Sequence, residues 1–246
     1  MKSIIGEDKT PSLRFDAGNV LFKKAVTAQP QELVVAAGMM DIYAAMGYDA
    51  VAVGANDLAA GIEFLQKNKK MTWLSANLTD EQGKPLFPAS RILTRDGLRI
   101  GVIGLTGAVP LNQLDLRAGD WQTPLTESLR TLRGQCHLVV VLSNLDSEGN
   151  AELVKNYPEI DLLITADGNR GNILPRPDEK PWVAQTMAQG KTLGVLTLSA
   201  QPPPVLPMRW EIRSITVPLK KTMPEDAAIA EMLQRIAKTN ATQPAR

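Results

Sequence analysis

Short apolar runs and longer amphipathic stretches alternate along the first two thirds of the chain. The runs have the length of buried strands, whereas the stretches between them repeat apolar residues every three or four positions, as helices do. Strands that alternate with helices predict an α/β layered fold, sheet-centred with flanking helices and a largely parallel sheet. The predicted strands are Leu13–Phe15, Ala50–Val53, Thr72–Ala76, Arg99–Leu105, Leu138–Leu142 and Leu162–Thr165, and the predicted helices are Pro30–Tyr48, Leu58–Lys67, Pro124–Leu132 and Asn150–Tyr157.

The last third of the chain is richer in strands. Trp182–Met187, Thr192–Ser199 and Trp210–Val217 follow one another without a helical pattern between them. Glycine and proline separate these runs, as is typical of turns. Further upstream, the pair Asp96-Gly97 lies between two apolar runs and predicts the turn of a β-hairpin.

A helix is predicted to close the chain. Thr222 precedes Glu225 by three positions, which is the spacing of a capping box, and Pro224 suits the first turn. Ile229 and Ile236 then fall on one helical face. No internal repeat interrupts the pattern, so residues 1–246 are predicted to form a single domain, either alone or as a fragment of a longer exported protein.

Charge and composition exclude several classes of function. The chain has 27 Lys and Arg against 26 Asp and Glu, so its formal net charge is +1 and no basic excess points to nucleic acid. One cysteine, Cys136, excludes an intrachain disulfide and cysteine-rich metal sites. One histidine, His137, excludes every chemistry that needs two, and its position before a strand favours an ordinary structural role. No apolar run reaches the roughly 18 residues of a membrane-spanning helix, and the first residues lack a signal-peptide pattern.

Four short polar stretches each follow a predicted strand. They are Asp16–Asn19, Gly54–Asp57, Ser143–Asp146 and Ala166–Asn169, all rich in Gly, Asn and Asp. Taken singly, each is explained by the preference of turns for these residues. Taken together they mark one edge of the sheet, because ligands of open α/β sheets bind where parallel strands end.

In their order and spacing these stretches resemble the calcineurin-like metallophosphatase domain of the 5′-nucleotidase family. LRFDAGNVLF is similar to the family's DAGD stretch, and MGYDAVAVGANDLAAG is similar to its LGYDAVTLGNHEFDYG stretch. WLSANL, LRIGVIGLT and VVVLSNL match later blocks, and residues 160–169 resemble the strand that leads into GGHSH. The resemblance runs from about Leu13 to the final helix and implies a layered metallophosphatase-like fold.

The family's metal ligands are replaced at the corresponding positions. The resemblance implies two metals held by His, Asp and Asn, yet this chain resembles a degenerate member that lacks the metal-ligand histidines. The family's earlier Asp-x-His pair has no counterpart before residue 15. Asn19 occupies the position of the bridging aspartate, Ala55 that of an asparagine ligand, Asn56 that of a histidine and Asp57 that of a glutamate. Three further histidines are replaced by Asn144, Asp167 and Asn169. Together with Asp16, these seven residues are the degenerate-site positions.

Two hypotheses follow from these replacements. The first is a catalytically inactive module that acts in binding or as a scaffold, with no metal, because neutral amides replace imidazole and a bridging carboxylate poorly for a transition metal. The alternative is a divergent metal-dependent phosphoester hydrolase, in which Asp and Asn oxygens, including those of Asp146, weakly bind Mg²⁺ or Ca²⁺. The resemblance also implies periplasmic or extracellular export and an unidentified protein partner or companion domain.

We further expect the strand-end loops to meet in one polar depression. The fold, and not the metal, sets where strands end. Amides at positions 19, 144 and 169 would lower the negative charge gathered there and would satisfy one another and the loop backbone directly. On this hypothesis the site is a neutral hydrogen-bonded network that needs no ion.

Overall fold

A five-stranded sheet forms the centre of the computed structural model, which describes residues 11–109, 113–167, 171–200 and 210–242. Its strand order is β10-β9-β8-β6-β5, and all neighbours are parallel except the β5–β6 hairpin. Asp96 and Gly97 at the hairpin turn both have positive φ, 48° and 75°, as the Asp-Gly signal predicts. The strands are β5 (Ser90–Arg95), β6 (Leu98–Leu105), β8 (Leu138–Ser143), β9 (Leu162–Thr165) and β10 (Trp182–Ala184).

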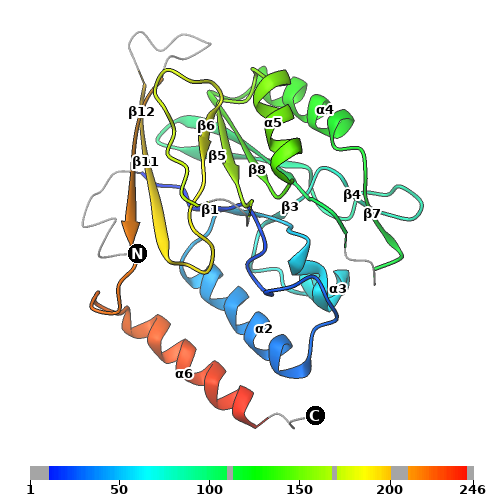
Figure 1. Cartoon of the computed structure of the whole chain (residues 1–246), viewed down its shortest axis with the longest axis vertical. Coiled ribbons are helices and arrows are strands. Elements are labelled where there is room, and N and C mark those ends of the chain that lie inside the picture. Colours follow the sequence, from blue (N-terminus) through cyan, green and yellow to red (C-terminus); the bar gives the residue numbers. More distant parts are fainter. Residues whose placement is uncertain (1–10, 110–112, 168–170, 201–209, 243–246) are drawn as a thin grey trace.

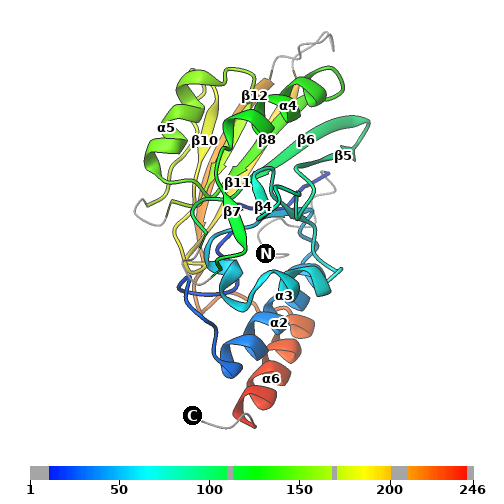
Figure 2. The same ribbon diagram turned by 90° about the vertical axis from the view of Figure 1, so that its right-hand side faces the viewer.

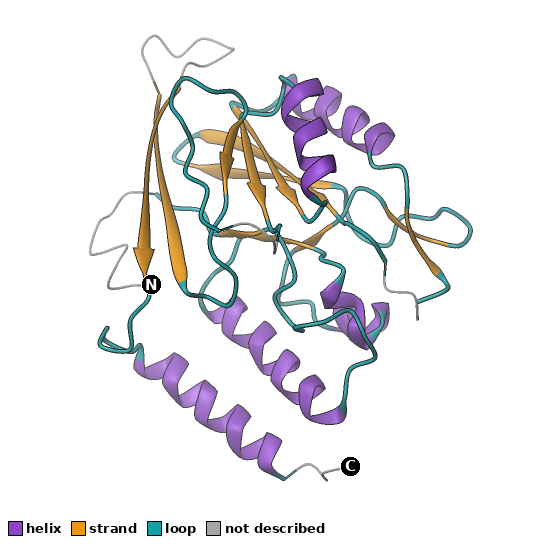
Figure 3. Cartoon of the chain, viewed as in Figure 1, coloured by secondary structure: helices purple, strands orange, loops and turns teal. Residues whose placement is uncertain are grey.

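The other strands of the described residues form three smaller sheets. A parallel three-stranded sheet has the order β1-β2-β3, β11 and β12 form a long antiparallel hairpin, and β4 pairs with β7. Figure 3 shows the hairpin beside the central sheet. These strands are β1 (Phe15–Asp16), β2 (Ala50–Ala52), β3 (Trp73–Leu74), β4 (Leu78–Asp80), β7 (Leu116–Ala118), β11 (Thr192–Ala200) and β12 (Trp210–Pro218).

The helices form two groups at different ends of the molecule. Helices α4 and α5 lie beside the central sheet, whereas α2, α3 and α6 lie at the other end of the molecule (Figures 1 and 2). The α/β fold with flanking helices is therefore as predicted. The helices are α2 (Pro30–Ala45), the 3₁₀ helix η1 (Asn56–Ala60), α3 (Ile62–Lys67), α4 (Gln122–Arg133), α5 (Ser147–Asn156) and α6 (Ala227–Ala241).

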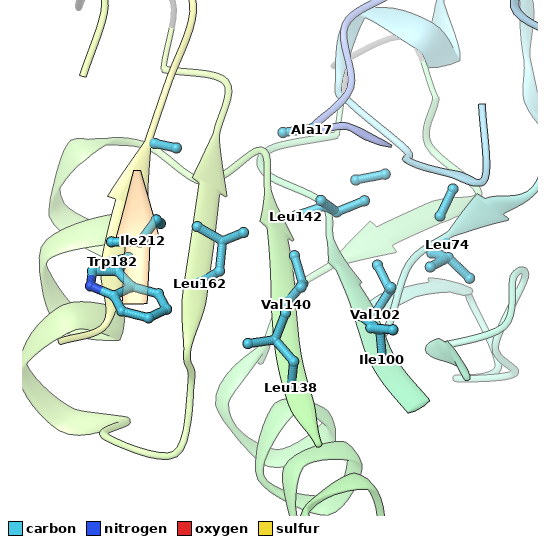
Figure 4. Packing of buried hydrophobic residues seen from close by; sticks show 13 residues of the cluster. Ala17, Leu74, Ile100, Val102, Leu138, Val140, Leu142, Leu162, Trp182 and Ile212 are labelled. Carbon is cyan, nitrogen blue, oxygen red and sulfur yellow. The ribbon is translucent and has the colours of Figure 1, made fainter. Parts of the chain in front are cut away.

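Strand β8 shows why an unbroken apolar run makes a central strand. Leu138, Val140 and Leu142 enter one core cluster, shown in Figure 4, together with Trp182 of β10 and Ile212 of β12. The alternate residues of the run, Val139 and Val141, enter a second cluster with residues of α4 and α5. Since side chains alternate between the faces of a strand, a run that is apolar at every position needs cover on both faces.

Two helix predictions need correction. The predicted helix Leu58–Lys67 is divided into η1 and α3, because Gly61 lies between them with φ of 81°, outside the helical region. The predicted capping box is wrong: α6 begins later, and Asp226 is its N-cap, accepting from the backbone N–H groups of Ala228 and Ile229. A carboxylate one residue before the helix satisfies those donors directly, so Thr222 is left outside the helix.

The cap assignment gives a first testable prediction. Asp226→Ala should destabilise α6 by about 1 kcal/mol, because two N–H groups of the first turn lose their acceptor. Hydrogen exchange of the α6 amides measures this loss, and Thr222→Ala is the matched control, which we expect to leave the exchange unchanged. If the two substitutions had equal effects, Thr222 would also cap the helix, as the sequence predicts.

None of the described helices is both long enough and apolar enough to cross a membrane.

Candidate functional site

Two loops that follow neighbouring parallel strands lie against each other. The chain leaves β1 at Asp16 and β2 at Ala52, and the strands pair Phe15 with Ala50 and Asp16 with Val51. Gly18 has φ of 99°, and a Cβ atom there would lie 2.7 Å from the backbone nitrogen of Gly54. The two backbones are therefore too close for a side chain at position 18.

Asp57 joins the two loops through its carboxylate. The side chain is fully buried. Its Oδ2 accepts from the backbone N–H groups of Asn19 at 2.8 Å and Gly54 at 3.0 Å, and its Oδ1 accepts from Leu21 N–H at 2.9 Å. Burial raises the pKa of Asp57 to about 6, against the opposing effect of these N–H donors. The carboxylate therefore acts as a structural acceptor for the backbone of both loops.

The asparagines of the site also bind the protein's own backbone. Asn19 has φ of 62°, a conformation that asparagine tolerates, and its Oδ1 accepts from Asn56 N–H at 2.8 Å. Asn144 follows β8, is buried, and its Oδ1 accepts from Ala55 N–H at 3.1 Å. Its Nδ2 donates to the Ala17 carbonyl oxygen at 3.3 Å. Three loops far apart in the sequence are thus connected through the two amide side chains.

Asp16 faces a tyrosine and not another site residue. Its Oδ1 accepts from Gly18 N–H at 3.0 Å, and its Oδ2 accepts from the Tyr43 hydroxyl of α2 at 3.1 Å. Burial raises the pKa of Asp16 to about 7, and the charge of Asp57 contributes in the same direction. The Tyr43 ring also stacks on Tyr48, with ring centroids 4.3 Å apart.

The remaining predicted residues have other surroundings. Asp167 is buried after β9, where its backbone N–H donates to Gln185 Oε1 and its carbonyl oxygen accepts from Gln185 Nε2. Asp146 is the N-cap of α5, accepting from Gly149 N–H at 2.9 Å, so its carboxylate is engaged by a helix. Asn169 lies outside the described residues. The structure therefore connects positions 19, 55, 56, 57 and 144, and it gives Asp146 a local structural role.

A second polar group, centred on Thr106, was missed by sequence reasoning. Thr106 follows β6, and its hydroxyl donates to the Val53 carbonyl oxygen at 2.8 Å and lies 2.6 Å from the Ser75 hydroxyl. Asn77 exchanges two hydrogen bonds with the Thr106 backbone, each of 2.9 Å. All three side chains are buried. Their position directly after apolar strands, shared with the predicted stretches, was the available signal.

The single histidine also has a structural role, as predicted. His137 Nδ1 accepts from Arg99 N–H at 2.9 Å, and the His137 backbone N–H donates to the Arg99 carbonyl oxygen at 2.8 Å. The imidazole therefore continues the pairing of β6 and β8 at the ends where these strands begin, whereas the candidate site follows the ends where they finish.

Among the described residues, the donors of the candidate site do not form the cluster that a two-metal centre needs. Both carboxylate oxygens of Asp57 accept backbone hydrogen bonds, and the side-chain oxygens of Asn19 and Asn144 do the same. Each oxygen that accepts one hydrogen bond keeps a second lone pair, but a catalytic pair of metals needs several ligands directed at a common space. Within the described ranges, no three His, Cys, Asp or Glu side chains are grouped so that they could hold a metal ion.

The architecture is that of a metallophosphatase-like domain, as found in 5′-nucleotidases and calcineurin-like phosphoesterases. The chain is similar to the sulfate thiohydrolase SoxB of Thermus thermophilus, with a TM-score of 0.75, 20% identity, and coverage of 92% of this chain and 42% of that one. It is similar to a 5′-nucleotidase precursor from Thermus thermophilus, with a TM-score of 0.75, 18% identity, and coverage of 96% and 51%. It also resembles the calcineurin-like phosphoesterase YfkN of Bacillus subtilis, with a TM-score of 0.72, 14% identity, and coverage of 93% and 83%.

These similarities concern the fold alone. The chain spans 42% and 51% of the first two of these proteins. No protein-family model and no curated protein sequence matches the chain. The expected layered metallophosphatase-like fold is therefore confirmed by structural similarity, at identities of 20% and below.

Proposed function

We propose that the chain is a catalytically inactive metallophosphatase-like module that acts in binding or as a scaffold. The observation that carries the proposal is the set of hydrogen bonds made by Asp57, Asn19 and Asn144 at the strand ends. In this network the acceptor atoms hold loops 17–21 and 53–57 together. Attack on phosphorus by a metal-activated water needs at least one metal with an open position, and the proposal is supported by the lack of a His, Cys, Asp or Glu cluster among the described residues.

The structural role of the network explains how the fold persists without a metal centre. In a two-metal site, cations neutralise gathered carboxylates and tie loops together. Here Asp57 makes these connections to backbone N–H groups from both loops, and Asn144 connects them to the end of β8. Neutral amides at positions 19 and 144 add no negative charge to the repulsion between Asp16 and Asp57.

Hydrolysis assays test the proposal directly. We expect no metal-dependent turnover of AMP or of a chromogenic phosphodiester with Mn²⁺, Zn²⁺, Co²⁺ or Mg²⁺. The 5′-nucleotidase of Thermus thermophilus, assayed in parallel, is a suitable positive control. A rate constant within the usual enzyme range of about 1–10³ s⁻¹, abolished by a chelator, would show that the chain is the alternative metal-dependent hydrolase.

Thermal unfolding tests the metal site separately from activity. We expect millimolar Ca²⁺, Mg²⁺ or Mn²⁺ to leave the melting temperature unchanged. A ligand at 100 times its dissociation constant stabilises a protein by about 2.7 kcal/mol, which is a shift of several degrees for a domain of this size. If one ion gives such a shift and Asp167→Asn removes it, the oxygen-donor site exists and the hydrolase alternative replaces our proposal.

Export to the periplasm or cell surface, and a protein partner or companion domain there, remain part of the proposal. The support for export is the family resemblance described above. Fractionation of cells that produce the native gene product tests the location.

A further inference from the structure

The hairpin of β11 and β12 has one face on the core and one face directed away from it. Residues that are paired directly across an antiparallel hairpin point to the same side. Ile212 of β12 belongs to the core cluster shown in Figure 4, and its partner Leu198 packs against that cluster. Leu196 and Trp210 also pack against it, so the even-numbered positions of both strands form the inner face. The odd-numbered positions therefore form the outer face.

Two pairs of apolar residues lie next to each other on the outer face. Leu193 is paired with Val217, and Val195 is paired with Ile215. None of these four residues belongs to, or packs against, a core cluster of the described part of the chain, and Ile215 is 58% exposed. An antiparallel sheet whose outer face meets water carries polar residues there, whereas a contiguous exposed apolar patch marks an interaction site. We call these four residues the outer apolar block.

Basic side chains lie at both ends of the outer apolar block. Arg213 is on the outer face of β12, two positions before the block. At the other end, Lys191 lies two positions before the block in β11, and its carbonyl oxygen accepts from Leu219 N–H at 2.9 Å, which continues the pairing of the hairpin. Lys220 and Lys221 follow in the exposed segment after β12. All four cationic side chains are exposed, and within the described ranges no ion pair engages them.

The charge of this surface is therefore one-sided around the block. Within the described hairpin the outer face has one acidic residue, Glu211, which is paired with Ser199 at the far end. A partner that covers the block needs an apolar centre and negative charge at both ends, because complementary charges favour the correct partner and like charges reject others. A second copy of the same surface does not meet this requirement, since it would bring the basic ends together.

We propose that the outer apolar block and its basic ends form a docking surface for an amphipathic helix of a partner protein, whose apolar side carries Asp or Glu at both ends. Two strands lie about 4.8 Å apart and a helix is about 10–12 Å wide, so one helix covers a two-stranded face. The face from position 191 to position 197 is about 20 Å long, which corresponds to about 13 residues of helix. A helix packed on a sheet face is also how α/β folds bury strands.

The shape of the surface favours a helix over a lipid membrane. Leu193, Val195 and Val217 are half-buried, and in the block only Ile215 is mostly exposed for insertion among lipids. The inference rests on the binding role in the proposed function. It does not rest on the lack of activity, because the hydrolysis and metal-binding tests do not involve the hairpin.

A matched pair of helical peptides tests the docking. Each peptide has about 16 residues with leucines along one side, and the ends of that side carry Glu in the first peptide and Lys in the second. We expect the labelled acidic peptide to bind the full chain, and the basic peptide to bind about tenfold more weakly, because its charges oppose those of the surface. Fluorescence anisotropy at low and high salt measures both affinities, and the difference should shrink as salt screens the charges.

Substitutions on the protein test the surface itself. Ile215→Asp should abolish binding of the acidic peptide, and Arg213→Glu should weaken it about tenfold by placing like charges together. Both side chains are exposed, and circular dichroism checks that each variant stays folded. Ile92→Asp is the matched control, because Ile92 is an apolar strand residue that is 38% exposed on β5, and we expect it to leave binding unchanged.

Several results would overturn the proposal. These are a lack of binding by the acidic peptide, equal binding of the two peptides, and binding that survives Ile215→Asp. Sedimentation of the chain with phosphatidylserine vesicles, without peptide binding, would show that a lipid surface covers the block. A dimer in light scattering that Ile215→Asp dissociates would show that a second copy covers it. Metal-dependent turnover would instead overturn the proposed inactivity and leave the peptide result unchanged.

Discussion

Asp57→Ala is expected to destabilise the protein by about 3–5 kcal/mol, the largest effect that we anticipate for a polar substitution. The change removes the acceptor of the N–H groups of Asn19, Leu21 and Gly54 at once. Leaving a buried donor unsatisfied costs about 1–3 kcal/mol each, and loop 17–21 loses its connection to loop 53–57 in the same step. Urea unfolding followed by circular dichroism measures the difference.

Asp146→Ala is the matched control for this substitution. Asp146 is also a carboxylate at the end of a strand, but it is exposed and accepts a backbone hydrogen bond from the first turn of α5. We expect a loss of about 1 kcal/mol, typical of a helix cap. If the two substitutions destabilise the protein equally, Asp57 does not join the two loops in solution.

Stability should fall as the pH rises from about 4 to about 7, and Asp16→Asn should remove much of this dependence. The pKa of Asp16 is raised from 3.8 to about 7 in the folded protein, chiefly by burial. Between these two values the folded state binds more protons than the unfolded state, so each increase in pH favours unfolding. The stabilisation is complete below pH 3.8, is lost as the pH passes 7, and does not change further above that.

The expected size follows from the shift. One pKa unit corresponds to 1.36 kcal/mol, and because Asp16 keeps some exposure to solvent, we expect about 2 kcal/mol and not the full shift. Asparagine keeps an acceptor for Gly18 N–H and offers a donor to the Tyr43 hydroxyl oxygen. Asp16→Asn should therefore be about 2 kcal/mol more stable than the unmodified chain at pH 8 and of equal stability near pH 4.

Unfolding by urea at pH 4, 6 and 8 measures this dependence for both chains. Asp57, whose pKa is raised to about 6, acts in the same direction and should leave a smaller slope in the variant. A variant whose stability at pH 8 equals that of the unmodified chain would show that the Asp16 carboxylate is ionised without penalty in the fold. Asp146→Asn, at an exposed helix cap, is the control.

The strands of the central sheet could be predicted because the signal is local: a strand that is covered on both faces is apolar at every position. β8 is apolar at every position from Leu138 to Leu142, and each of these residues is buried on one face or the other. The turn at Asp96-Gly97 was equally clear, since both residues adopt the positive φ that few other pairs tolerate. Helix limits were less accurate, because Thr222 and Asp226 compete as caps over a few residues and three-dimensional context selects between them.

The sequence also located the candidate site, since polar residues directly after apolar runs mark the ends of parallel strands. It could not show what Asp57 binds. The carboxylate is 36 and 38 residues from Leu21 and Asn19, and Asn144 is 89 residues from Ala55. Which backbone N–H groups face an oxygen depends on how two loops approach, and that approach depends in turn on the missing side chain of Gly18.

The packing of α6 on α2 shows the same difference between what the sequence predicts and what the tertiary structure decides. The apolar positions of both helices are visible in the sequence, and they predict that each helix needs a covered face. That Gly38 receives Ile236, 198 residues further along the chain, follows from no local pattern. Periodicity records which face of an element must be buried, because it reflects the geometry of one helix or strand. The partner of that face is selected by the shape of surfaces that meet only in the folded chain.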